Sequence, residues 1–152
     1  MNIERTALVM HSAQHMYKLV HDVAAYPEFL SWCTYSEVHE QSAEHQLASL
    51  GVKVAGIERK FKTHNTLQPY QSVKLTLVEG PFRALAGEWR FKQLGQSGSK
   101  ISLELNFDFA PGLITTAFQR GFKSIADRLV QEFCRRADQY PATVAKESEH
   151  GT

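Results

Sequence analysis

The feature that most constrains the fold is a single apolar stripe near the C-terminus. From Gly112 to Tyr140, apolar residues recur at steps of three and four: Ile114, Phe118, Phe122, Ile125, Leu129, Phe133 and Ala137. This spacing predicts one amphipathic helix, roughly 42 Å long at the rise of an α-helix, which Pro141 ends. A helix of that length needs an equally long apolar surface to cover its stripe.

The preceding segment is predicted to supply that surface. From about Ser36 to Phe109, apolar and polar residues alternate, which is typical of antiparallel strands with one buried face. The clearest strand places Ile101, Leu103, Leu105, Phe107 and Phe109 opposite Ser102, Glu104, Asn106 and Asp108. A hairpin turn is expected over Gly95–Ser99. About six strands are expected here, with one side of the sheet packed.

The N-terminal segment predicts one strand and one or two short helices. Asn2–Met10 alternates as a strand, Ser12 is a suitable N-cap, and Pro27 breaks the helix that follows. We therefore expect an α+β fold in which a curved antiparallel sheet wraps around a long C-terminal helix. A chain of 152 residues predicts one domain, here residues 1–140, with residues 141–152 as a disordered tail.

Composition excludes several classes of protein. With 43% hydrophobic and 22% charged residues, the chain is not globally disordered. It contains no apolar run near the ~18 residues of a membrane span and no signal-peptide pattern, so a cytoplasmic protein without stable membrane insertion is expected. Cys33 and Cys134 cannot form a disulfide framework and are expected to be reduced, partly buried thiols.

The net charge of +1 hides an asymmetry along the chain. Residues 1–52 carry two Lys/Arg against six Asp/Glu, residues 53–136 carry fourteen against seven, and the remainder carries one against three. The middle of the chain can therefore present a basic surface, or its charges can simply be solvated strand and helix faces.

A long helix on a curved sheet leaves an apolar wedge, and such wedges are common ligand sites. Residues at inward positions are the candidate ligand-binding residues: Trp32, Phe61, Leu75, Leu77, Phe82, Trp89, Phe91, Leu105, Phe107, Phe118, Phe122 and Ile125. Aromatic residues at these spacings more often belong to a solid core than to a cavity wall. Gly121 within the helix either leaves room for a ligand or permits close contact between helix and sheet.

Catalytic and metal-binding patterns are poor. His11 and His15 have i,i+4 spacing but no third ligand, so no metal site is expected. Neither cysteine has a partner typical of a catalytic dyad, and Glu88, Glu104 and Asp108 fall at outward strand positions. The sequence therefore favours a protein that is not an enzyme and requires no cofactor.

Several motifs together resemble one family. The segment from Asp22 to Cys33 (DVAAYPEFLSWC), Gly80-Pro81-Phe82, the segment 87–91 (GEWRF), the segment 105–109 (LNFDF) and the segment 133–137 (FCRRA) resemble the coenzyme Q-binding protein family of the START-like (polyketide cyclase/lipid transport) superfamily. Within it, the chain most resembles the bacterial ribosome association toxin (RatA-like) subgroup. The resemblance covers about residues 2–140.

The resemblance implies a helix-grip fold and two functions that do not exclude each other. The first is the binding of ubiquinone or a related polyprenyl lipid under the C-terminal helix, in support of respiration. The alternative is a toxin of a type II toxin–antitoxin system that binds the large ribosomal subunit, blocks subunit association and has a small antitoxin partner. A cyclase or other enzyme is a third class. Candidate ribosome-binding residues are Lys53, Arg59, Lys60, Lys62, Arg90 and Lys92.

Overall fold

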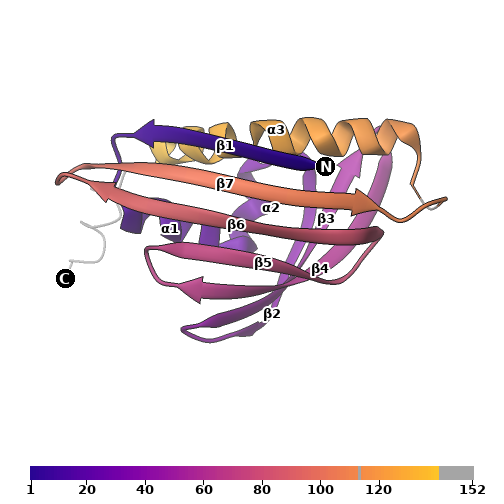
Figure 1. Cartoon of the computed structure of the whole chain (residues 1–152), viewed down its shortest axis with the longest axis horizontal. Coiled ribbons are helices and arrows are strands. Elements are labelled where there is room, and N and C mark those ends of the chain that lie inside the picture. The colour runs from indigo at the N-terminus through magenta and orange to yellow at the C-terminus, as the bar shows by residue number, and fades with distance from the viewer. Residues whose placement is uncertain (113, 141–152) are drawn as a thin grey trace.

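In the computed structural model, which describes residues 1–112 and 114–140, a curved sheet holds one long helix across its inner face (Figure 1). The predicted tail over residues 141–152 lies outside the described residues. The elements in chain order are β1 (Asn2–Val9), α1 (Ala13–His21), the 3₁₀ turn η1 (Val23–Ala25), α2 (Tyr26–Phe29), β2 (Cys33–Gln41), β3 (His45–Val54), β4 (Ile57–Gln68), β5 (Ser72–Glu79), β6 (Phe82–Leu94), β7 (Gly98–Phe109) and α3 (Thr116–Gln139). The predicted α+β architecture is confirmed.

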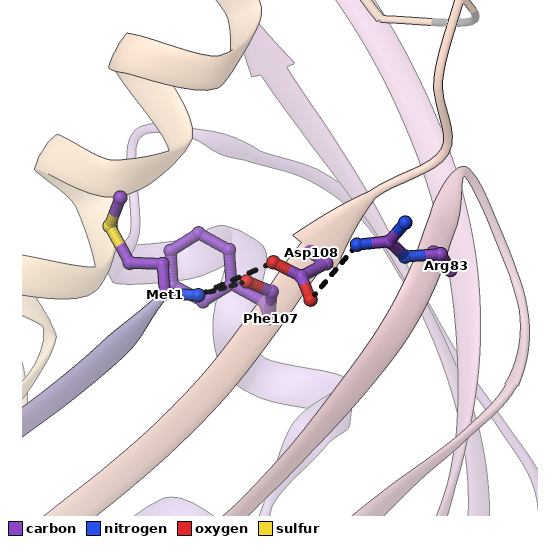
Figure 2. A network of polar contacts seen from close by, with 4 residues as sticks. All are labelled: Met1, Arg83, Phe107 and Asp108. Carbon is purple, nitrogen blue, oxygen red and sulfur yellow. Dashed lines mark hydrogen bonds and ion pairs between the residues drawn. The ribbon is translucent and has the colours of Figure 1, made fainter.

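The sheet has seven strands in the order β1-β7-β6-β5-β4-β3-β2, and all neighbours are antiparallel. Strands β2 to β7 form a meander, and β1 joins its far edge with Ile3 opposite Leu105. The nitrogen of Met1 donates to the carbonyl oxygen of Phe107 at 3.0 Å (Figure 2). It also lies 3.4 Å from Asp108 Oδ1, and Asp108 Oδ2 lies 3.5 Å from Arg83. These contacts join β1, β7 and β6 at one end of the sheet.

Period-two patterning decides which face is buried. Along β7, Ile101, Leu103, Leu105 and Phe107 are buried while the residues between them are more exposed. The inner side chains meet the stripe of α3, where Phe118, Phe122, Ile125 and Phe133 are buried. Burial of each large apolar side chain stabilises the fold by roughly 1.5–3 kcal/mol, so the facing stripes account for much of the driving force.

Helix α3 begins at Thr116 rather than at Gly112, so the predicted helix started four residues too early. Gly112 has a φ of 77°, a left-handed turn conformation that interrupts a helix. Thr115 has an extended backbone, and its side chain accepts a hydrogen bond from the backbone N–H of Phe118. This N-cap fixes the start of the helix.

Helices α1 and α2 close one end of the groove between sheet and α3. Ser12 caps α1 as predicted, since its hydroxyl accepts from the N–H of His15 at 3.0 Å. The N-terminus of α1 is joined to the β6–β7 hairpin, because Ala13 N–H donates to Gln93 Oε1 and Ser99 Oγ donates to the carbonyl of His11, both at 2.8 Å. Among the helices that the structure describes, none is long and apolar enough to cross a membrane.

Candidate functional site

A cavity of about 100 Å³ lies between the sheet and α3. Its walls come from nearly every element: α1, η1, α2, the segment before β2, strands β3 to β7, and one side of α3. Almost all lining side chains are apolar, and Phe122, Ile125, Ala126, Leu129 and Phe133 form the wall on α3. The site can therefore hold an apolar group.

The structure divides the twelve candidate ligand-binding residues into two sets. Those that line the cavity are Trp32, Phe61, Leu75, Trp89, Leu105, Phe122 and Ile125. Those that do not line it are Leu77, Phe82, Phe91, Phe107 and Phe118. The alternation of inward and outward positions was therefore sufficient to find buried or partly buried residues, but not to separate the cavity wall from the solid core.

Phenylalanines fill the wedge that the sequence placed near one end of the helix. Phe122 lies 5.0 Å from Phe107 and 5.2 Å from Phe82 between ring centroids, and Phe118 stacks on it at 6.4 Å. Phe91 packs outside this cluster, edge-on to Tyr17 of α1, with 5.7 Å between the ring centroids. Such aromatic pairs stabilise a packed core. The open space lies beside this cluster, under residues 122–133 of α3.

Two polar side chains line the otherwise apolar cavity. Thr63 Oγ1 donates to Asn65 Oδ1 at 2.9 Å, and Asn65 Nδ2 donates to Gln46 Oε1 at 2.8 Å. Gln46 Nε2 donates in turn to the carbonyl of His21 at 3.0 Å. All three side chains are buried. This buried polar chain (Thr63, Asn65 and Gln46) gives the cavity a hydrogen-bonding wall.

The sequence interpretation missed Thr63 and Asn65 although a signal was present. Both lie on β4 at even steps from Phe61, which was predicted to face inward. Polar residues at inward positions are informative, because a buried polar group needs a partner.

The segment carrying the Asp22–Cys33 motif closes one side of the cavity against α3. The indole N–H of Trp32 donates to Glu132 Oε1 at 3.0 Å, and Arg136 pairs with Glu28 at 3.3 Å. The Arg136 guanidinium also lies 4.6 Å from the centre of the Phe29 ring. The motif therefore fastens α2 and its flanks to α3.

The titratable groups around the cavity do not form an acid–base pair. Tyr26 is the one titratable residue among the described lining residues; its hydroxyl donates to the carbonyl of Val20, and burial raises its pKa far above the usual range. Cys33 and Cys134 are free thiols, as predicted, and burial raises the pKa of both. In the part of the chain that the structure describes, no group of three His, Cys, Asp or Glu residues could hold a metal ion.

Gly121 permits close contact between helix and sheet, which settles the two alternatives left open by the sequence. A Cβ atom at this position would lie 1.9 Å from Val54 Cγ1 at the end of β3. The glycine therefore does not contribute space to the cavity.

The candidate ribosome-binding residues do not form one surface. Lys53, Lys60 and Lys62 share the outer face of β3 and β4, whereas Arg90 and Lys92 lie on β6 near the level of Ser72 and Gln68. Six residues of β4 separate Lys62 from Gln68, roughly 20 Å. Several of these charges have partners: Lys62 pairs with Glu79 at 3.4 Å, Arg90 pairs with Glu88 at 3.2 Å, and Lys60 lies 4.2 Å from the Tyr35 ring centre.

Comparison with known proteins agrees with this architecture. The family described as "Polyketide cyclase / dehydrase and lipid transport" matches residues 9–134. The chain belongs to this START-like family. The Zhui aromatase/cyclase of Streptomyces sp. R1128 superposes with a TM-score of 0.81 at 19% identity, covering 91% of this chain and 94% of that one. A START superfamily protein of Mycobacterium smegmatis superposes with a TM-score of 0.75 at 16% identity, covering 91% and 97%. These two similarities show the fold alone.

Named relatives of this chain include proteins of both kinds that the sequence resembles. The "Ribosome association toxin RatA" of Vibrio cholerae is 44% identical over 90% of this chain and 95% of its own length. The protein of the same name in Escherichia coli K12 is 45% identical over 89% and 85%. A mitochondrial coenzyme Q-binding protein of Drosophila melanogaster is 29% identical, and the match covers 86% of this chain but 57% of that protein.

Proposed function

We propose that this protein associates with the ribosome, as its relatives' name indicates, and that it binds the large subunit and hinders subunit joining, as the family resemblance implies. The observation that carries the proposal is the 44–45% identity, over about nine-tenths of the chain, to ribosome association toxins from two organisms. The excess of Lys and Arg over residues 53–136 supports it, because ribosomal RNA presents a dense array of phosphates. The role is non-catalytic, cytoplasmic, and open to neutralisation by a small antitoxin partner.

Sedimentation tests the proposal directly. Purified protein is mixed with separated ribosomal subunits, and the mixture is run on a sucrose gradient after magnesium is raised to allow joining. We expect the protein in the large-subunit fraction and a smaller peak of joined ribosomes. Protein that stays at the top of the gradient, with joining unchanged, contradicts the proposal. Binding should weaken steeply as salt is raised, because phosphate contacts release counterions.

We propose as a second function that the cavity binds an apolar ligand with one polar group, such as the head of ubiquinone. The specific observation in favour is the pair Thr63 and Asn65 in an apolar wall. Asn65 Nδ2 carries two N–H groups, and one of them donates to Gln46. The other is suited to a ligand carbonyl. At about 100 Å³ the cavity is smaller than the ~150 Å³ that accepts benzene, so α3 must shift for a polyprenyl ligand.

Lipid extraction tests this second function. The protein is purified from cells, extracted with organic solvent and analysed by mass spectrometry, and its melting temperature is measured with and without a short-chain ubiquinone. We expect a co-purified quinone or lipid and a higher melting temperature. Ala126 lines the cavity, so Ala126→Leu fills the space and should abolish the ligand-induced rise. If no lipid is recovered and added ubiquinone does not stabilise the wild-type protein, ligand binding is contradicted.

A further inference from the structure

The outward face of α3 carries a row of exposed basic residues. Arg120, Ser124, Arg128, Gln131 and Arg135 follow one another at steps of three and four on the side opposite the buried stripe, and all five are exposed. Lys123 is exposed beside them. We call the four cations Arg120, Lys123, Arg128 and Arg135 the α3 cationic face. From Arg120 to Arg135 it extends roughly 22 Å along the helix.

Each carboxylate of the same helix contacts a residue of another element rather than one of these four cations. Asp127 Oδ1 lies 2.5 Å from Arg5 of β1, and Asp138 Oδ1 lies 2.7 Å from His11 Nε2. Glu132 accepts from the indole of Trp32. None of the four cations has an ion-pair partner within 4.0 Å among the described residues. Their charge is therefore available to a partner.

The β3–β4 hairpin packs on α3 where Val54 meets Gly121. This hairpin carries Lys53 and Arg59, but Lys53 lies on the outer face of the sheet, away from the helix. Arg90 and Lys92 lie on β6, which β5 separates from β4.

We propose that the α3 cationic face is the surface that contacts the phosphates of ribosomal RNA. The inference rests on the proposed function and assigns the RNA contact to the outer side of the helix rather than to the outer side of the sheet. Three arginines at intervals of roughly 10–12 Å suit a phosphate backbone, since each guanidinium can donate two hydrogen bonds to one phosphate. Ser124 and Gln131, between the arginines, add polar side chains at the same contact surface.

Two matched variants test the assignment. One replaces the helix cations (Arg120→Gln, Lys123→Gln, Arg128→Gln, Arg135→Gln), and the other replaces four cations of the sheet (Lys60→Gln, Lys62→Gln, Arg90→Gln, Lys92→Gln). Both remove four positive charges. The affinity of each for purified large subunits is measured by sedimentation at several salt concentrations, and melting temperature and circular dichroism establish that each variant is folded.

We expect the helix variant to lose at least tenfold in affinity, with a salt slope smaller by roughly 3–4 if all four cations contact phosphates, because each lost phosphate contact removes about 0.7–0.9 from the slope. The sheet variant should lose less than threefold. Equal losses, or a larger loss in the sheet variant, would overturn the assignment while leaving ribosome association intact. A helix variant that binds subunits normally but loses binding to phosphatidylglycerol vesicles would also overturn it. Wild-type protein that does not sediment with subunits contradicts the proposed function itself.

Discussion

Gly121 of α3 and Val54 of β3 are in direct contact, so close that a Cβ atom on Gly121 would lie 1.9 Å from Val54 Cγ1. The end of the β3–β4 hairpin is therefore held against the helix at a point where only glycine fits. Since glycine in a helix costs about 1 kcal/mol relative to alanine, the close approach must contribute at least a comparable stabilisation.

We predict that Gly121→Ala destabilises the protein by about 1–2 kcal/mol, because overpacking at Val54 exceeds the gain in helix propensity. In a Val54→Ala background the same substitution should instead be neutral or stabilising, since the remaining contact to the Cβ of residue 54 is 3.1 Å. Urea unfolding of the four proteins measures this coupling. Ser124→Ala, on the exposed side of the same helix, is the control. A stabilising Gly121→Ala in the wild-type background would contradict the prediction.

The buried polar chain gives a second prediction. Asn65→Ala removes the acceptor of Thr63 and the donor to Gln46 and leaves both partners buried, so the free energy of unfolding should fall by about 1–3 kcal/mol. Thr66→Ala, at the exposed neighbouring position of β4, should change it by less than about 0.5 kcal/mol. Chemical denaturation measures both. If the two losses are equal, the polar chain does not stabilise the fold.

How far the sequence predicts this molecule can be judged from particular elements. The α3 stripe and the alternation of β7 were readable because burial of one face imposes a period of 3.6 or 2. The start of α3 at Thr116 could not be predicted from this periodicity, because it depends on the conformation of Gly112 and the hydroxyl of Thr115. Local caps and turns move a boundary without changing the periodicity around them.

The site was less predictable than the fold. The alternation along the strands placed Trp89 and Phe107 equally on the inner face of the sheet. In the structure, Trp89 lines the cavity, whereas Phe107 packs on Phe122. That difference depends on the curvature of the sheet and the height at which α3 crosses it, which no residue pattern encodes. The basic surface was also predicted only in part. The charge excess along the chain led to strand cations, but two of them, Lys62 and Arg90, pair with Glu79 and Glu88. The cations of α3 were not singled out from the sequence.

The bond from Trp32 to Glu132 supplies a third prediction. Glu132→Ala should lower the free energy of unfolding by about 1–2 kcal/mol, since a partly buried indole N–H loses a charged acceptor that joins the segment before β2 to α3. Glu132→Gln retains an acceptor oxygen and should lose less than half as much. Melting temperature and tryptophan fluorescence report the change. A Gln variant as destabilised as the Ala variant would show that charge, rather than the hydrogen bond, is what matters.

Stability should depend on pH through His15. This side chain is buried on α1, and desolvation lowers its pKa below the ordinary 6.5, with a smaller effect from His11, whose ring lies 5.5 Å away. Lys18 also lowers the pKa, whereas the carbonyl groups of Tyr140 and Ala137 oppose the shift. His15 Nε2 has no hydrogen-bond partner among the described residues, so a proton on this nitrogen is not stabilised.

The sign of the pH effect follows from this shift. Above about pH 6.5 the imidazole is neutral in both states, and folding carries no penalty; as pH falls below that value, the unfolded chain binds a proton that the folded protein does not. The free energy of unfolding should therefore decrease from about pH 6.5 downward and level off below the folded-state pKa.

His15→Gln should flatten this part of the profile, whereas Gln14→Ala, exposed on the same helix, should not. Burial lowers the pKa of His21 as well, so some dependence should persist in His15→Gln until His21 is also replaced. Urea denaturation from pH 5 to 8 measures the profile, and a wild-type protein whose stability rises as the solution is acidified would contradict the assignment to a buried neutral histidine.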